Sequence, residues 1–83
     1  MKFKEKRGNT FVFDGGYAGE ELELEYRHFD SFEFQGKNLF GSVVIDKEMN
    51  VSTCPVSGYF RVPFSDIQNA ANLVQILIKE GLV

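Results

Sequence analysis

Three residues of this chain have the side-chain types of a nucleophilic active site. Cys54 supplies the one thiol, His28 the one imidazole, and Asp30 a carboxylate that could orient that imidazole. His28 and Asp30 are two positions apart, so on a strand they share a face, with about 6–7 Å between their α-carbons. The competing interpretation makes Cys54 a small buried apolar residue and the other two a neutral polar pair. We favour the second interpretation, expect no enzyme and assign no catalytic residue.

Residue types that hold metals or phosphate groups are sparse. One His and one Cys are too few nitrogen and sulfur ligands for a tetrahedral zinc site. Alternating glutamates on a strand are spread along a line rather than gathered around a hard cation. The glycine-rich segment 14–19 lacks the helix and the lysine that complete a phosphate-binding loop. The sequence therefore predicts no metal site and no cofactor.

A charged stripe between Gly19 and Gln35 is the strongest candidate for a binding surface. Residues of one parity are mainly apolar or aromatic, whereas the other parity gathers acids. Alternate side chains of a strand point to opposite faces, so this pattern predicts an apolar face backed by an acidic one. The candidate partner-binding residues all belong to the acidic parity: Glu21, Glu23, Glu25, Phe29 and Glu33.

The acidic stripe has two interpretations that differ in what lies beside it. Lys2, Lys4 and Lys6 alternate in the same way, and lysines lying across from the glutamates would make a solvated, neutralised face. Without them, the acids and Phe29 would form a negative surface with an aromatic anchor, suited to a basic protein groove. The outward parity also includes three further apolar or aromatic residues: Val12, Phe40 and Tyr59.

Composition limits the class of protein. The 83 residues carry a net charge of −3, made of +3 in residues 1–7 and −6 in the remainder, so direct nucleic-acid binding is not expected. A single cysteine allows no intramolecular disulfide, which favours a reducing, cytoplasmic setting. No secretory signal or membrane-spanning stretch is recognisable. Nine phenylalanines and no tryptophan predict a phenylalanine-rich core.

Hydrophobic periodicity predicts strands followed by one helix. A hairpin is expected over 2–6 and 10–14, with Lys2, Lys4 and Lys6 on one face. The stripe follows as one bent strand or as two strands divided near residues 30–31. Further strands are expected over 39–46, 51–54 and 58–62. From Ser65 the apolar spacing becomes helical, with a capping box between Ser65 and Gln68 and a stop at Gly81.

These elements predict a single α+β domain over residues 1–83. Its strands occupy about 2–62 and form a curved antiparallel sheet of four to six strands, with an amphipathic helix over about 65–80 packed on the apolar face. We expect a small acidic protein–protein interaction module, with an inhibitor or antagonist of a basic nucleic-acid-handling or defence protein as its specific form. The alternatives are a small-ligand or thiol-based catalytic protein using His28, Asp30 and Cys54, and a structural homo-oligomer. A homodimer through a sheet edge is compatible with each.

Overall fold

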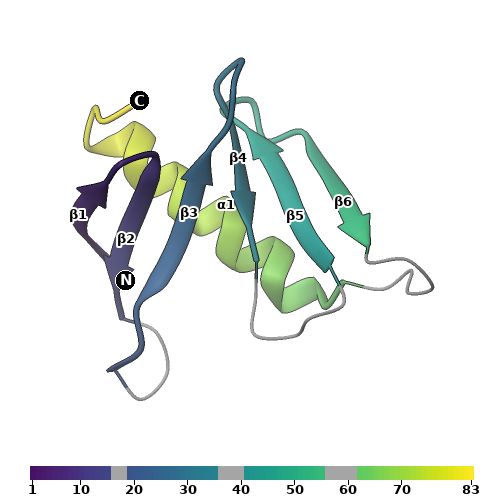
Figure 1. The fold of residues 1–83 in the computed structure, drawn as a ribbon, viewed down its shortest axis with the longest axis horizontal. Coiled ribbons are helices and arrows are strands. Elements are labelled where there is room, and N and C mark those ends of the chain that lie inside the picture. Colours follow the sequence, from purple (N-terminus) through teal and green to yellow (C-terminus); the bar gives the residue numbers. More distant parts are fainter. Residues whose placement is uncertain (16–18, 36–40, 56–61) are drawn as a thin grey trace.

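The computed structural model describes residues 1–15, 19–35, 41–55 and 62–83, which form a six-stranded sheet and one helix (Figure 1). Every neighbouring pair of strands is antiparallel, the strands follow one another in chain order, and the sheet is not closed. This confirms the predicted α+β class. The elements are β1 (Lys2–Arg7), β2 (Thr10–Asp14), β3 (Leu22–Tyr26), β4 (Ser31–Phe34), β5 (Gly41–Asp46), β6 (Val51–Pro55) and α1 (Phe64–Lys79).

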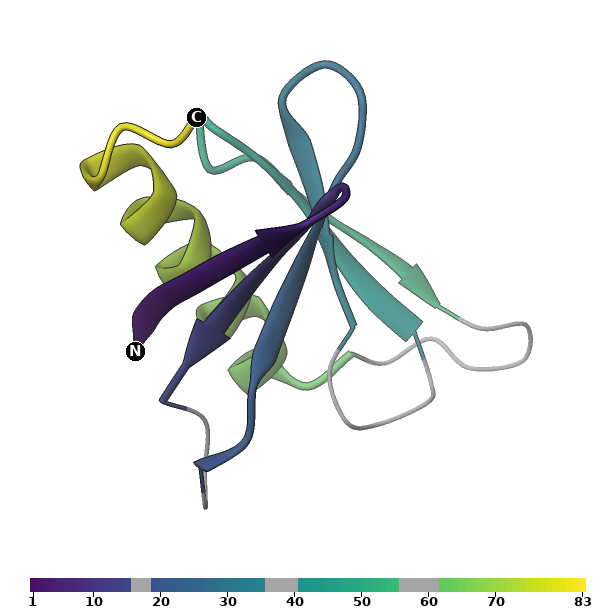
Figure 2. The ribbon, with the colours of Figure 1, turned by 60° about the vertical axis from the view of Figure 1, so that its left-hand side comes forward.

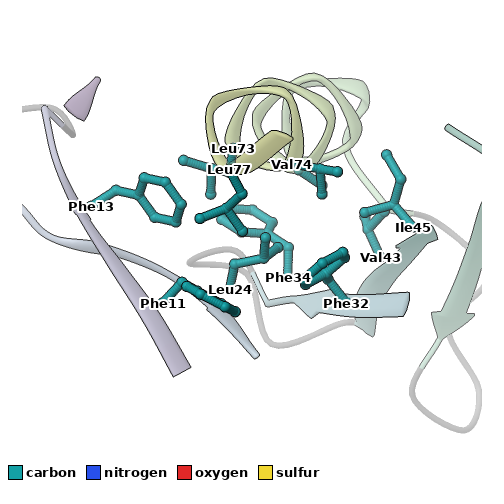
Figure 3. Packing of buried hydrophobic residues seen from close by; sticks show 11 residues of the cluster. Phe11, Phe13, Leu24, Phe32, Phe34, Val43, Ile45, Leu73, Val74 and Leu77 are labelled. Atoms are coloured by element: carbon teal, nitrogen blue, oxygen red, sulfur yellow. The ribbon is translucent and has the colours of Figure 1, made fainter. Parts of the chain in front are cut away.

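The core lies between α1 and one face of the sheet (Figure 3). Its members alternate along each strand, as a half-buried strand requires, and recur at three- and four-residue spacing on the helix. Aromatic rings meet edge to face within it, Phe11 against Phe32 at 6.2 Å and Tyr26 against Phe32 at 5.6 Å between ring centroids. The buried cluster comprises Phe11, Phe13, Leu24, Phe32, Phe34, Val43, Ile45, Ala70, Leu73, Val74 and Leu77.

A β-bulge in β1 changes which face its side chains occupy. Phe3 lies opposite Phe13, but the register then shifts, so that Glu5 lies opposite Val12 and Lys6 opposite Phe11. One extra residue in a strand reverses the parity beyond it. The expectation that Lys2, Lys4 and Lys6 share one face is therefore wrong: Lys6 lies on the core side, where its ammonium is 5.3 Å from the centroid of the Phe11 ring.

The acidic stripe forms two strands, which settles the alternative left open by the sequence. β3 ends at Tyr26, β4 begins at Ser31, and residues 27–30 connect them. His28 and Asp30 are therefore in a turn, and the expectation that they share a strand face is wrong. Two polar residues at alternate positions fit the two-residue spacing of a strand, but they supply no apolar side chains that would bury one face of that strand.

β3 and β4 pair over a short length and then diverge (Figure 1). Among the described residues their register holds two pairs, Glu25 with Glu33 and Tyr26 with Phe32, whereas β2–β3 and β4–β5 each hold four. Continued past Glu25 and Glu33, this register would next bring Leu24 opposite Phe34 and then Glu23 opposite Gln35, the latter pair on the acidic side. The sheet is consequently open on its acidic side beside these two residues.

The helix runs from Phe64 to Lys79, within one residue of the prediction at each end. The predicted capping box is wrong, because the helix begins one residue earlier: Pro63 is the N-cap and makes no side-chain cap hydrogen bond. Gly81 ends the helix as expected, at φ 71°, where the Leu82 N–H donates to Leu77 O and the Gly81 N–H to Ile78 O. No helix formed by the described residues is long and apolar enough to cross a bilayer.

Several sequence expectations fall on residues outside the described ranges. They are the outward positions of Phe40 and Tyr59, the first two residues of the strand expected over 39–46, and most of the strand expected over 58–62.

Candidate partner-binding site

The β3–β4 turn holds two non-glycine residues in the left-handed backbone region. Phe29 has φ 62° and Asp30 has φ 54°. The turn is closed by the Arg27 N–H, which donates to Ser31 O at 2.7 Å, and by Ser31 Oγ, which donates to His28 O at 2.9 Å. Aspartate tolerates this conformation, but for a phenylalanine it is unusual and costs about 1–2 kcal/mol. The turn is thus well bonded but contains a residue poorly suited to its backbone.

Phe29 is 92% exposed, more than any other large apolar side chain that the structure describes. Its ring meets the His28 ring edge-on, with 5.4 Å between centroids and 84° between planes. The turn extends beyond the ends of the strands and clear of α1 (Figure 2). The Phe29 side chain therefore adds nothing to the core.

Asp30 is linked to the core through Tyr26. The Tyr26 hydroxyl donates to Asp30 Oδ1 at 3.2 Å, and the Tyr26 ring packs edge-on against the buried ring of Phe32. The structure shows no hydrogen bond or ion pair from His28 to this carboxylate. Asp30 is thus oriented by a residue anchored in the core rather than by the histidine.

The β5–β6 turn, over residues 47–50, lies at the same end of the sheet. Asp46 accepts hydrogen bonds from the Glu48 N–H at 2.9 Å, the Asn50 N–H at 2.9 Å and Asn50 Nδ2 at 3.0 Å. The donors from Asn50 and then Glu48 lower the pKa of Asp46, because they stabilise its ionised form. Met49, at φ 67°, packs its side chain against the core cluster.

A hollow of about 320 Å³ separates these two turns, and we call it the tip site. It is lined by Phe29, Asp30, Asp46, Lys47 and Glu48. One exposed aromatic ring thus borders three carboxylates and a single ammonium group. This chemistry suits a cationic side chain, because a cation can lie over the ring while carboxylates accept its hydrogen bonds.

A second hollow, of about 130 Å³, lies where β3 and β4 diverge. Its lining is Thr10, Glu23, Glu25, Glu33 and Gln35, and we call it the acidic face. Small-molecule sites usually enclose roughly 300–1,000 Å³, so this hollow has room for the head of one side chain rather than for a whole ligand.

Arg27 partly neutralises the acidic face. Its guanidinium lies 3.8 Å from Glu25 Oε1 and 3.3 Å from Glu33 Oε1, two carboxylates that the strand register places directly opposite one another. Glu33 also accepts a hydrogen bond from Ser42 Oγ at 2.8 Å. Glu23 makes no ion pair with any described residue. Three carboxylates against one guanidinium leave this surface with a net charge of −2.

Glu21 belongs to a different electrostatic environment from the other three glutamates. Lys4 Nζ pairs with Glu21 Oε2, and Arg7 Nη1 lies 3.4 Å from Glu21 Oε1. The Lys4 hydrogen bond, followed by the charges of Lys4 and Arg7, lowers the pKa of Glu21. The N-terminal cations therefore neutralise one end of the stripe and not the other.

The structure brings together three of the five predicted binding residues and places the other two apart from them. Glu23, Glu25 and Glu33 line the acidic face on the side of the sheet opposite the helix, whereas Glu21 precedes β3 and pairs with the N-terminal cations. Phe29 is exposed as expected, but it lies on a turn rather than on the acidic parity of a strand. The prediction missed Asp46, Lys47 and Glu48, whose one sequence signal is the polar turn between two apolar strands.

Val12 lies on the acidic side of the sheet, as its parity predicts, but it is completely buried. Its strand neighbours are Glu5 and Glu23, and Lys4 of β1 joins Glu21, which immediately precedes β3. The aliphatic stems of such long side chains cover apolar surface while their charged ends stay in water. The expectation that Val12 contributes to an exposed patch is therefore wrong.

The register separates Cys54 from the turn that carries His28 and Asp30. Cys54 pairs with Ser42 at one end of β5, whereas Ser31, which follows the turn, pairs with Asp46 at the other end. Four residues of extended strand correspond to about 13 Å. Among the described residues, no group of three His, Cys, Asp or Glu side chains is arranged to hold a metal ion.

The chain was compared with protein-family models, curated proteins and solved structures, and none of them matches it.

Proposed function

We propose that the protein is a small protein-binding module that contacts a basic partner surface through the tip site and the acidic face. The observation that carries the proposal is Phe29, an aromatic side chain 92% exposed on a left-handed backbone. Strained backbone conformations persist only where the surrounding structure holds them in place, and they cluster at functional sites.

The exposed ring has the properties of an interface anchor. Aromatic side chains contribute much of the binding free energy in protein interfaces, because they bury a large apolar area with few rotatable bonds. Phe29 also differs from Phe64, the other strongly exposed phenylalanine, which is 68% exposed but lies in the first turn of a helix with ordinary backbone. Phe64 therefore serves as a matched control.

Charge at both hollows favours a cationic partner. The tip site and the acidic face lie at the two ends of the β3–β4 hairpin, and each has more carboxylates than cations. Complementary charge increases association rates and excludes acidic partners. A protein whose basic surface normally meets phosphate groups would fit, and an inhibitor of a nucleic-acid-handling or defence protein in the cytosol is the specific form that we favour.

The test is quantitative capture with matched variants. Wild type, Phe29→Ser, Phe64→Ser and the triple variant Glu23→Gln, Glu25→Gln, Glu33→Gln are immobilised and exposed to extract from the source organism. Glu21 is left intact, because Lys4 and Arg7 already neutralise it. We expect a basic protein retained by wild type and Phe64→Ser, and reduced about tenfold or more by Phe29→Ser and by the triple variant.

Circular dichroism and unfolding curves establish that each variant folds. The proposal fails if folded Phe29→Ser and the folded triple variant retain the same proteins, in the same amounts, as wild type. It also fails if the proteins that depend on Phe29 are acidic.

A further inference from the structure

The two edges of the sheet differ in how well they resist pairing with another strand. β1 carries a bulge and five charged residues among its six, both of which are common protections of an edge strand. β6, the opposite edge, has the sequence Val-Ser-Thr-Cys-Pro and carries no charge. Pro55 at its end is its one protective residue, since proline lacks an N–H. In the part of the chain that the structure describes, one edge is therefore guarded and the other is largely open.

The register shows which backbone groups of β6 point away from the sheet. The Asp46 N–H donates to Asn50 O at 3.2 Å, which makes this a hydrogen-bonded pair. Hydrogen-bonded and non-hydrogen-bonded pairs alternate in an antiparallel ladder, so Val44 with Ser52 and Ser42 with Cys54 are hydrogen-bonded as well. The N–H and C=O groups of Val51 and Thr53 consequently face outward at the edge.

The side chains along this edge are also accessible. Val51, Ser52 and Thr53 are exposed, and Val51 retains 42% of its surface. The main contacts of α1 with the sheet are made to β5, β4 and β1, and Figure 1 shows β6 at the border of the sheet beyond the helix. A strand added here would meet no helix formed by the described residues.

We propose that β6 pairs with β6 of a second copy of this chain in antiparallel orientation. In the register that suits the outward groups, Val51 lies opposite Thr53 of the second copy, Thr53 opposite its Val51, and Ser52 opposite its Ser52. Both N–H and both C=O groups on each side are then bonded, which gives four hydrogen bonds, and Pro55 falls outside the pairing. The two six-stranded sheets become one continuous sheet.

A second copy suits this edge because a two-fold axis brings each residue near its own counterpart. The acidic face and the charged β1 would meet like charges in such an arrangement. In the β6–β6 pair, only Val, Ser and Thr side chains of the two copies meet, and these pair without charge repulsion. The buried area of a single strand pair is small, so the association is weak and is measured at high micromolar to millimolar chain concentrations. The proposal does not depend on the tip site or the acidic face.

Disulfide trapping tests both the partner and the register. In a Cys54→Ser background, Ser52→Cys places two thiols on a non-hydrogen-bonded pair, with about 4.5 Å between α-carbons, a separation that a disulfide can span. Val51→Cys in the same background is the register control, because its two copies would lie about 8 Å apart, beyond disulfide reach. Lys2→Cys tests whether the guarded edge, β1, also pairs with a second copy. We expect about tenfold more covalent dimer from Ser52→Cys than from either control.

Light scattering of the untrapped chain completes the test. The wild-type mass should rise from 9.4 kDa toward twice that value with concentration, and Thr53→Pro, which removes an outward N–H not used within the sheet, should remain a monomer. The proposal is overturned if wild type stays monomeric throughout, if the three cysteine variants trap equally, or if folded Thr53→Pro associates as wild type does.

Discussion

Two turns at the same end of the sheet contain non-glycine residues in the left-handed backbone region, and the side chains of these residues lie in different environments. In the β5–β6 turn, Met49 packs against the core, and the Asp46 carboxylate accepts three hydrogen bonds. In the β3–β4 turn, Phe29 adopts the same kind of backbone, but its ring lies in solvent. The first turn is explained by what it contributes to folding, whereas the second is not.

The difference separates a residue that packs against the core from one that we propose contacts a partner. The strain of the left-handed backbone at Met49 is offset by the apolar surface that its side chain buries. Phe29, 92% exposed, has no such compensation from the described residues. The same contrast occurs along the β3–β4 hairpin itself, since Phe32, three residues later, is completely buried. Substitutions at these positions therefore distinguish the two roles.

The largest effect is expected at Phe32. Phe32→Ala removes a fully buried ring that contacts Phe11 and Tyr26, and should lower the free energy of unfolding by about 3–5 kcal/mol. A chain of this size has roughly 4–12 kcal/mol in total, so the variant should be close to unfolding at room temperature. Urea denaturation followed by circular dichroism measures this, with Phe29→Ala as the matched control. Equal losses in the free energy of unfolding for Phe32→Ala and Phe29→Ala would show that the two side chains do not differ in their contribution to stability.

A smaller loss is expected at Met49. Met49→Ala keeps the left-handed backbone but removes a partly buried side chain, so the free energy of unfolding should fall by about 1–2 kcal/mol. Met49→Leu, which preserves volume, should retain most of that stability. If Met49→Ala unfolds at the same urea concentration as wild type, the packing of this turn does not explain its conformation.

The contribution of Asp46 should depend on pH. The pKa of this carboxyl is lowered in the folded chain, so the stabilisation is fully present above the unfolded value of about 4 and disappears as the pH falls through the folded value. Asp46→Asn lacks this titration. The difference in stability between wild type and Asp46→Asn should therefore be constant from pH 7 to about 5 and shrink toward pH 2. A stability difference that does not change with pH would show that the charge of the Asp46 carboxylate does not stabilise the fold.

The sheet and the helix were predictable because burial on one face imposes a period, and that period is visible in residues such as Leu24, Phe32, Phe34 and Leu77. The turn at Phe29 could be predicted only as one of two alternatives, since it contains no glycine, asparagine or proline, and the polar alternation continues through it. The bulge in β1 leaves no mark in composition either. It determines that Lys4 pairs with Glu21 while Lys6 lies over Phe11, so the charge of the stripe could not be resolved before the register was known.

The most direct test of the account is the stability of Phe29→Gly. Glycine adopts φ 62° without strain but increases the entropy of the unfolded chain, and these effects are each about 1 kcal/mol. Because the ring contributes nothing to the core, urea denaturation should give a free energy of unfolding equal to that of wild type or up to about 1 kcal/mol higher. A loss of about 2 kcal/mol or more would show that Phe29 is held for folding and would contradict its proposed role as a contact residue.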